Sequence, residues 1–244
     1  MTTQTDLKHP TATERMAALH EKKNNVFLDF VFYQVDPQWR RLPSTEKKKG
    51  IDSFLETIEK HKKKVETRSY STIGIREDAD FLLWTFAKDI IHIQDLLADL
   101  FKTPLGAFLQ IRHSFLSMKR PSIYSGTHPQ TFELGLTPLN YLIVYPFEKS
   151  REWYLLPFQE RKKMMEEHRA VGQEFPTVRL NTTYAFGLSD GDFVLAFETD
   201  FPDDFQSLIM KLRETQASRY TVRDTPMMLC VRKELIECLE ALGA

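Results

Sequence analysis

The stretch YPFEKSREWYLLP, residues 145–157, repeats an earlier stretch of the same chain, YQVDPQWRRLP, residues 33–43. Matching residues continue after both stretches at an offset of 112 to 114 residues. The recurring positions are Tyr33, Trp39, Pro43, Gly74, Asp80 and Phe81 in the first copy and Tyr145, Trp153, Pro157, Gly187, Asp192 and Phe193 in the second. A near-constant offset over half of the chain indicates a duplicated structural unit.

Each copy has the same order of predicted elements. Aromatic and β-branched runs at 25–35 and 141–145 predict buried strands. Charged runs with helical spacing follow, at 44–66 and 158–171. The remaining elements expected are strands at 69–76, 80–87 and 107–117 with a helix at 89–102, then strands at 178–188, 192–198 and 227–232 with a helix at 202–215. The predicted fold class is therefore α+β with two tandem ferredoxin-like (βαββαβ) halves, whose sheets pack face to face or curl around a shared core.

The length of 244 residues suits two units of about 120 residues each. We expect a polar N-terminal arm at 1–24 and a first ferredoxin-like domain, without a cofactor, at 25–120. Residues 121–140 are rich in Pro, Ser, Gly and Thr, which predicts a linker. The second domain, at 141–244, is expected to carry the function, because a histidine lies on the apolar face of its helix.

The composition excludes several classes of protein. A net charge of −1 gives no basic face for nucleic acid. Cys230 and Cys238 are too few for a disulfide scaffold, and the CxxCH motif of covalent haem attachment is absent. Residues 1–25 are polar and do not resemble a signal peptide, and no run of apolar residues is long enough to span a membrane. We therefore expect a cytoplasmic protein without membrane insertion.

His168 shares one side of the second-half helix with apolar residues. Met164, Met165, His168 and Val171 lie at i, i+1, i+4 and i+7, and charged residues take the other side. Such a histidine is either a hydrogen-bonded core residue or a metal ligand, and the spacing alone favours the core residue. No second inward His or Cys lies nearby to complete a zinc site, so a metal at His168 would suit iron already held by a porphyrin.

Tyr145 and Lys149 fall at the end of a predicted strand and in the loop beyond it. Side chains at strand ends and in adjoining loops commonly contact ligands. The plainer interpretation is an edge tyrosine and a surface lysine, and the spacing alone favours it.

Residues 145–175, YPFEKSREWYLLPFQERKKMMEEHRAVGQEF, resemble the haem segment of the chlorite dismutase family. Within that family they are most similar to the coprohaem decarboxylase branch, whose pattern is YPM-x-K, NWYMLP, an E-R-rich helix and H-x-x-x-G. LRETQASRY at 212–220 resembles the family's MRFDEVSARY. The similarity is clear over 141–220 and weaker before residue 120. The family also has the duplicated ferredoxin-like architecture, of the dimeric α+β barrel type.

The resemblance implies a role for each residue of the segment. His168 matches the proximal ligand of the haem iron, so the second half is expected to be the haem-binding domain. Tyr145 matches a tyrosine that becomes a radical and removes a hydrogen from a propionate. Lys149 matches the lysine that pairs with that propionate.

Four further residues are expected to contact the cofactor. Arg213 and Ser218 match residues that hold other propionates, and Trp153 matches a tryptophan beside the proximal helix. Asn181 stands thirteen residues after His168, where chlorite-degrading members have an arginine and typical decarboxylases a glutamine. The alternation of side chains along a strand allows Asn181 to face the pocket. Because asparagine has no positive charge, this departure argues against chlorite chemistry.

The branch implies an enzyme of haem biosynthesis that decarboxylates iron-coproporphyrin III (coprohaem) to haem b, with hydrogen peroxide as oxidant. It also implies a homopentamer. A further propionate-binding arginine of the family falls near Thr131, with Arg112 and Arg120 as alternatives. Three other hypotheses stay open: another haem enzyme of the family, acting as a peroxidase or a chlorite O2-lyase; a non-catalytic haem carrier or sensor; and a ferredoxin-like protein with no cofactor.

Overall fold

The computed structural model of this chain describes residues 25–124 and 130–243, so the arm expected at 1–24 lies outside the described residues. The first half contains β1 (Phe27–Val35), η2 (Pro37–Arg41), α2 (Ser44–His61), β2 (Val65–Ser71), β3 (Phe81–Ala87), α3 (Ile90–Phe101), η3 (Gly106–Phe108) and β4 (Leu109–Met118). After η4 (Thr131–Glu133), the second half contains β5 (Tyr141–Lys149), α4 (Arg151–Leu155), α5 (Phe158–Gln173), β6 (Arg179–Tyr184), β7 (Phe193–Thr199), α6 (Pro202–Arg213), η5 (Gln216–Tyr220), β8 (Thr221–Arg223), β9 (Met228–Arg232) and α7 (Leu235–Glu240).

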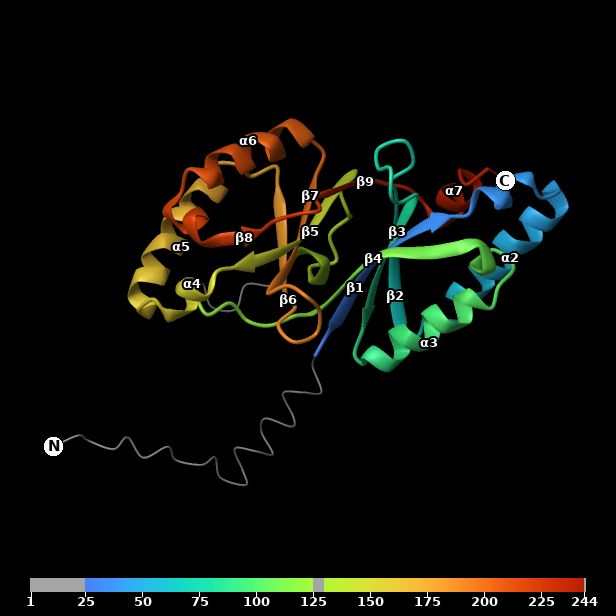
Figure 1. Ribbon diagram of the computed structural model, residues 1–244, viewed down its shortest axis with the longest axis horizontal. Helices are drawn as coiled ribbons and strands as arrows, with labels where there is room; N and C mark the ends of the chain where they lie inside the picture. The colour runs from blue at the N-terminus through green and yellow to red at the C-terminus, as the bar shows by residue number, and fades with distance from the viewer. Residues whose placement is uncertain (1–24, 125–129, 244) are drawn as a thin grey trace, which may run out of the picture.

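One antiparallel sheet runs through both halves and closes on itself (Figure 1). Its strand order is β7-β6-β4-β1-β3-β2-β9-β5, and β5 pairs again with β7. The halves meet at two short seams, where Met118 of β4 pairs with Tyr184 of β6, and where β2 pairs with β9 at Tyr70 and Ser71. The prediction of two tandem ferredoxin-like halves is confirmed, and the sheets curl around a shared core.

The closed sheet explains why β1 is apolar at consecutive positions rather than at alternate ones. Its inward side chains, such as Phe30, join a core inside the barrel, where Phe30 stacks on Trp84 with ring centroids 4.8 Å apart. Its outward side chains, such as Val31, join a second core under the helices of the first half. Because both faces of the strand are buried, both need apolar residues.

The two copies of the repeat have equivalent hydrogen bonds as well as matching residues. The Asp80 carboxylate accepts a bond from the Val35 backbone N–H at 2.8 Å. Asp192 accepts the corresponding bond from the Lys149 N–H, also at 2.8 Å. The turn glycines of both copies have a left-handed φ, 75° at Gly74 and 70° at Gly187. Each recurring aspartate therefore fixes the end of the first strand of its half.

Several details differ from the sequence-based expectation. β2 spans Val65–Ser71 rather than 69–76. It begins earlier because α2 ends at His61 rather than at 66, and it ends earlier because the chain turns at Gly74. Gly172 does not end α5, which continues through Gln173. The C-terminal helix α7 returns to the first half, where Cys238 joins the core under α2.

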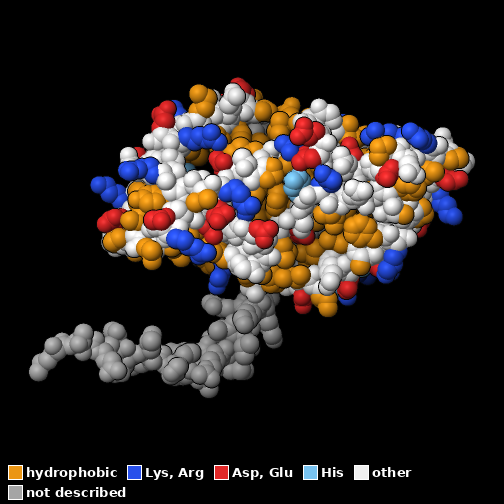
Figure 2. Space-filling model, in the orientation of Figure 1, with side chains coloured by type: hydrophobic (Ala, Val, Ile, Leu, Met, Phe, Trp, Pro, Cys, Tyr) orange, Lys and Arg blue, Asp and Glu red, His pale blue; other side chains and the backbone are white. Residues whose placement is uncertain are grey.

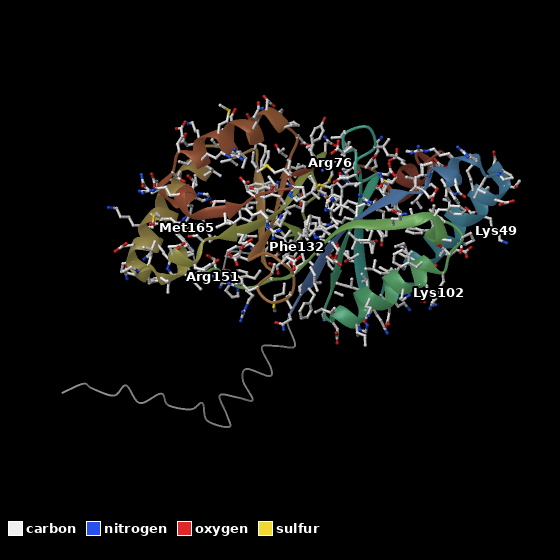
Figure 3. All side chains as sticks on the ribbon, in the orientation of Figure 1. Lys49, Arg76, Lys102, Phe132, Arg151 and Met165 are labelled. Carbon is white, nitrogen blue, oxygen red and sulfur yellow. The ribbon has the colours of Figure 1, made fainter. Side chains whose placement is uncertain are left out.

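Acidic and basic side chains are interspersed over the face of the molecule shown in Figure 2, in line with a net charge of −1. Figure 3 places Lys49 on α2 and Lys102 just after α3 at the outer side of the first half, with Phe132 between the halves. Within the ranges that the structure describes, no helix has both the length and the apolar character needed to cross a membrane.

Candidate active site

β5 presents a phenol and an ammonium group toward the helices of the second half. Tyr145 and Phe147 alternate along the strand, so their side chains lie on the same side of the sheet. Lys149 follows a β-bulge after Glu148, and its ammonium group lies over the Phe147 ring on that side. Tyr145 is 3% exposed and stacks on Phe197 of β7, with ring centroids 5.9 Å apart. Phe205 of α6 packs in the same cluster. These side chains therefore lie outside the barrel, in the layer between the sheet and its helices.

Burial and two charged neighbours determine the pKa of the Tyr145 hydroxyl. Burial raises the pKa of this phenol, the negative charge of Asp224 raises it further, and the positive charge of Arg213 opposes both. Arg213 Nη2 donates to Asp224 Oδ2 at 3.1 Å, and Ser218 Oγ donates to the Arg213 carbonyl oxygen at 2.6 Å. Tyr145 is therefore protonated at neutral pH, and Arg213, one of the two residues predicted to hold propionates, lies close enough for its charge to act on it.

Lys149 is held in an aromatic cage. Its ammonium nitrogen lies 5.1 Å from the ring centroid of Phe147 and 4.9 Å from that of Trp153. It donates to the Ala217 carbonyl oxygen at 2.5 Å and to Thr221 Oγ1 at 3.3 Å. Burial lowers the pKa of Lys149 to about 8. The lysine is thus a fixed and largely protonated cation with no carboxylate partner among the described residues.

His168 on α5 is a neutral imidazole. Burial lowers its pKa to about 4, the positive charge of Lys149 lowers it further, and Glu167 opposes both. Its ring nitrogen Nδ1 is buried and has no hydrogen-bond partner in the structure. Among the residues described, no group of three or more His, Cys, Asp and Glu could hold a metal ion. A metal at His168 therefore needs most of its ligands from a bound group.

The helix that carries His168 is less buried than its counterpart in the first half. α2 buries Gly50, Ile51 and Phe54, whereas no residue of α5 is fully buried. α5 packs mainly on η5 and α6, and Glu167 accepts a bond from the Gln216 N–H at 3.1 Å. Figure 3 places Met165 of α5 at the outer side of the second half. The apolar face around His168 is therefore only partly covered by the chain itself.

Two residues that the sequence analysis did not single out for the site support Lys149. Asp192 Oδ2 accepts the Lys149 N–H and also the Tyr154 hydroxyl, at 2.8 Å and 2.6 Å. Tyr154 lies next to Trp153 on α4, so this bond also ties α4 to the end of β5. The recurrence of Asp80 as Asp192 was the available signal for this role, since both aspartates bond to the strand end.

The orientation expected of Asn181 is wrong. Asn181 pairs with Ala196, which belongs to the core inside the barrel, so its side chain points away from Tyr145. It is fully buried, accepts the Thr131 hydroxyl at 2.8 Å, and contacts Glu198 at 3.5 Å through Nδ2. Alternation along a strand fixes which residues share a face, but it does not say which face is inside. Thr131 lies with Asn181, in the same interior group.

The other candidates lie elsewhere. Arg120 lies near Tyr184 of β6, where its positive charge partly offsets the rise in the tyrosine pKa that burial causes. Arg112 is an exposed residue of β4. His113 Nε2 lies 2.8 Å from Asp78 Oδ2, so this strand histidine is held by a carboxylate. In the part of the chain that the structure describes, no hydrogen bond or ion pair joins any of these residues to Lys149 or His168.

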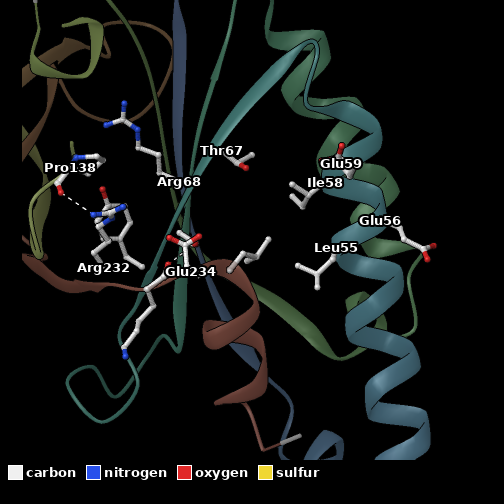
Figure 4. Close-up of a pocket in the computed structure, with 13 residues that line it drawn as sticks. Leu55, Glu56, Ile58, Glu59, Thr67, Arg68, Pro138, Arg232 and Glu234 are labelled. Atoms are coloured by element: carbon white, nitrogen blue, oxygen red, sulfur yellow. Dashed lines mark hydrogen bonds between the residues drawn. The ribbon is translucent and has the colours of Figure 1, made fainter. Parts of the chain in front are cut away.

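A cleft of about 620 Å³ lies between α2 and the seam of β2 and β9 (Figure 4). Leu55 and Ile58 point toward the strands, whereas Glu56 points away from them. Arg232 donates to the Pro138 carbonyl oxygen at 3.1 Å. Both acidic and basic residues line this cleft, and none of the predicted site residues does. The cleft is therefore separate from the candidate active site.

Comparisons with known proteins agree with this architecture. A family model described as chlorite dismutase matches residues 47–233. A coproheme decarboxylase of Mycolicibacterium smegmatis is 39% identical over 158 residues, which cover 64% of this chain and 68% of the relative. A chlorite dismutase of Ideonella dechloratans is 28% identical over 209 residues, which cover 81% of this chain and 73% of the relative. The structure of a chlorite dismutase variant from Candidatus Nitrospira defluvii matches with a TM-score of 0.84 and 25% identity, over 94% of this chain and 99% of that chain.

The two ferredoxin-like halves close into one barrel, and the second half carries a helix with a histidine, which identifies the chain as an α+β barrel protein. The chain belongs to the chlorite dismutase family, since the family model matches well over half of it. The resemblance found in the sequence is confirmed at this level.

Proposed function

We propose that this protein is a coprohaem decarboxylase. Its substrate is iron-coproporphyrin III, and two propionates are converted in turn to vinyl groups, which gives haem b. Each conversion removes carbon dioxide, one proton and two electrons from a propionate, and hydrogen peroxide takes up two electrons and two protons to form two waters. The observation that carries the proposal is the grouping of Tyr145, Lys149 and His168 in the layer between the second-half sheet and its helices. The 39% identity to a coproheme decarboxylase supports it.

The residues around His168 fit an iron porphyrin. A metal ligand must be deprotonated, and a pKa of about 4 leaves this imidazole neutral at physiological pH. The buried nitrogen without a hydrogen-bond partner and the partly covered apolar face of α5 suit a large, flat apolar group. We assign His168 as the iron ligand, and the bound iron porphyrin supplies the redox chemistry with peroxide.

We assign Tyr145 to the removal of hydrogen from the substrate. The phenol is buried against Phe197, so water has little access to it. Its raised pKa keeps the proton on the oxygen until the ring is oxidised. The oxidised phenol would take a hydrogen atom from the propionate carbon bonded to the porphyrin ring. A second electron would pass from that carbon to the oxidant derived from hydrogen peroxide, and loss of carbon dioxide from the neighbouring carbon would leave the vinyl group.

We assign Lys149, Arg213 and Ser218 to binding the propionates of the substrate. Lys149 is caged by Phe147 and Trp153 and lacks a carboxylate partner within the described ranges, so a substrate carboxylate completes its environment. Arg213 and Ser218 form a second group near Tyr145. Because coprohaem carries four carboxylates, its affinity should fall as salt concentration rises.

The face of β6 that looks toward the helices favours decarboxylation over chlorite chemistry. The residues on this face are Leu180, Thr182 and Tyr184, and none carries a positive charge. Asn181, at the position expected for a distal arginine or glutamine, lies inside the barrel. A peroxidase of the same family and a non-catalytic haem carrier are the remaining alternatives.

Incubation of the protein with coprohaem and hydrogen peroxide tests the proposal. Mass spectrometry of the porphyrin should reveal two successive losses of carbon dioxide plus two hydrogens. Bleaching of the porphyrin without these losses would favour a peroxidase, and an unchanged porphyrin would favour a carrier.

We also propose that the chain forms a homopentamer, which is common in the family that the sequence resembles. Light scattering of the purified protein, with and without coprohaem, measures the assembly mass, and a monomeric mass in both states would contradict this.

A further inference from the structure

Arg161 lies on the same face of α5 as His168, seven residues earlier. Seven residues make almost two helical turns, or about 10 Å along the axis. Arg161 is thus placed toward the start of α5, next to the aromatic residues that begin this helix. The function proposed above gives it no role.

The guanidinium of Arg161 has incomplete partners. Its Nη1 lies 3.5 Å from the Tyr124 hydroxyl, and its carbon Cζ lies 5.8 Å from the ring centroid of Phe158. Its Nε is buried and has no hydrogen-bond partner. In the described ranges, no carboxylate lies within ion-pair distance of Arg161. Burying a charged N–H without an acceptor costs free energy. An anionic ligand that accepts a hydrogen bond from Nε would remove this cost.

The first half provides a comparison within the same chain. Lys47 is three residues after the start of α2, as Arg161 is three residues after the start of α5. The Lys47 ammonium donates to the backbone carbonyl oxygen of Gly243. The first half thus supplies an acceptor to the cation at this position, whereas the second half leaves the Arg161 Nε without one.

The Trp153 ring connects Arg161 to the candidate active site. Tyr124, which contacts Arg161, lies edge-on to Trp153, with ring centroids 6.4 Å apart. Lys149 lies over the same tryptophan, 4.9 Å from its ring centroid. Two cations without a carboxylate partner in the described structure, Lys149 and Arg161, therefore border one aromatic group.

We propose that Arg161 is a carboxylate-binding residue of this site, donating its Nε–H and an Nη–H to one carboxylate arm of the porphyrin. A guanidinium presents two parallel N–H groups that match a carboxylate. Arg161 then adds to Lys149 and Arg213 as a determinant of specificity for a porphyrin with several carboxylates. This inference rests on the proposed function, because it takes the porphyrin as the ligand.

Titration with metal-free coproporphyrin III, followed by fluorescence, tests Arg161 without any turnover. Arg161→Gln should raise the Kd about tenfold or more, since a charged hydrogen bond is lost, and Arg161→Lys should restore part of the affinity. Arg169 is an exposed residue of the same helix, so Arg169→Gln should bind as the wild type does. The tetramethyl ester of coproporphyrin should bind wild type and Arg161→Gln equally.

Equal affinities of Arg161→Gln and Arg169→Gln for coproporphyrin would overturn the inference about Arg161 alone. Failure of the wild type to bind coproporphyrin would overturn both this inference and the proposed function. Thermal unfolding of the ligand-free protein separates binding from a structural role. Arg161→Gln should unfold at the wild-type temperature or above, because it removes an unsatisfied buried donor. A lower unfolding temperature together with unchanged binding would make Arg161 a structural residue.

Discussion

Phe54 and His168 occupy the same position in the two copies of the repeated helix, ten residues after the start of α2 and of α5. Phe54 is fully buried and packs edge-on against Phe81, with ring centroids 6.4 Å apart. His168 instead keeps a buried ring nitrogen without a hydrogen-bond partner. The first half therefore uses this position for its core. The second half places there a polar ring that destabilises the ligand-free protein.

Replacing His168 by phenylalanine, as in the first half, should change how stability depends on pH. The folded-state pKa of about 4 lies below the ordinary value of 6.5, so between these values the unfolded chain binds the proton and the folded protein does not. The free energy of unfolding of the wild type should therefore fall as pH decreases from 6.5 to 4. His168→Phe should lack this contribution, and the difference should approach about 1.4 kcal/mol per pH unit.

Denaturant unfolding of both proteins across this pH range measures the difference. Comparing the two proteins is necessary because Asp29, whose pKa burial raises to about 6, contributes with the opposite sign in both. Parallel profiles of wild type and His168→Phe would contradict the account that His168 stays neutral in the folded protein.

Tyr145→Phe should abolish decarboxylation and leave coprohaem affinity within about twofold, because only the reacting hydroxyl is removed. Tyr33 is the matching residue of the first half, and its buried hydroxyl has no hydrogen-bond partner. Tyr33→Phe should therefore keep full activity and be as stable as the wild type or slightly more so. Turnover by mass spectrometry and binding by absorption titration measure the two effects. Full turnover by Tyr145→Phe would remove Tyr145 from the mechanism.

Coproporphyrin binding should weaken as pH rises above about 8, the pKa of Lys149. The porphyrin carboxylates stay ionised, so loss of the lysine charge reduces affinity by up to about tenfold per pH unit. In Lys149→Arg the cation persists to much higher pH, and the affinity should stay level from pH 7 to 9.5. Lys163→Arg, at an exposed position of α5, should behave as the wild type. An identical decline in Lys149→Arg would show that another group titrates.

Asp192→Ala should weaken both stability and porphyrin binding. It removes the acceptor for the Lys149 N–H and the Tyr154 hydroxyl, at a cost of about 1–3 kcal/mol in the free energy of unfolding. Asp80→Ala removes the matching bond to Val35 and should destabilise the fold without affecting binding. Similar binding by the two variants, after correction for the folded fraction, would mean that Asp192 does not position Lys149.

The fold could be predicted because the repeat constrained it twice. Each half supplied the same order of elements, so the strands predicted at 25–35 and at 141–145 supported each other. The second half also showed the limit of this reasoning. Gly172 suggested a helix end, but a glycine can remain in a helix at a modest cost, and α5 continues past it.

The candidate site could be predicted residue by residue only where a motif located the residue. The resemblance singled out Tyr145, Lys149 and His168, but it could not say which face of β6 lies inside a closed barrel, so Asn181 was misplaced. The contacts of Arg161 depend on Tyr124, which is remote in sequence. Such contacts are set by tertiary packing, which helical or strand periodicity does not encode.

The absorption spectrum of the protein with one equivalent of iron-coproporphyrin tests the central claim, that His168 faces the porphyrin and binds its iron. Wild type should give a saturable Soret shift with the spectrum of an imidazole-ligated iron, and His168→Phe should lose that spectrum while keeping the fold by circular dichroism. The same imidazole-type spectrum in His168→Phe would contradict the account.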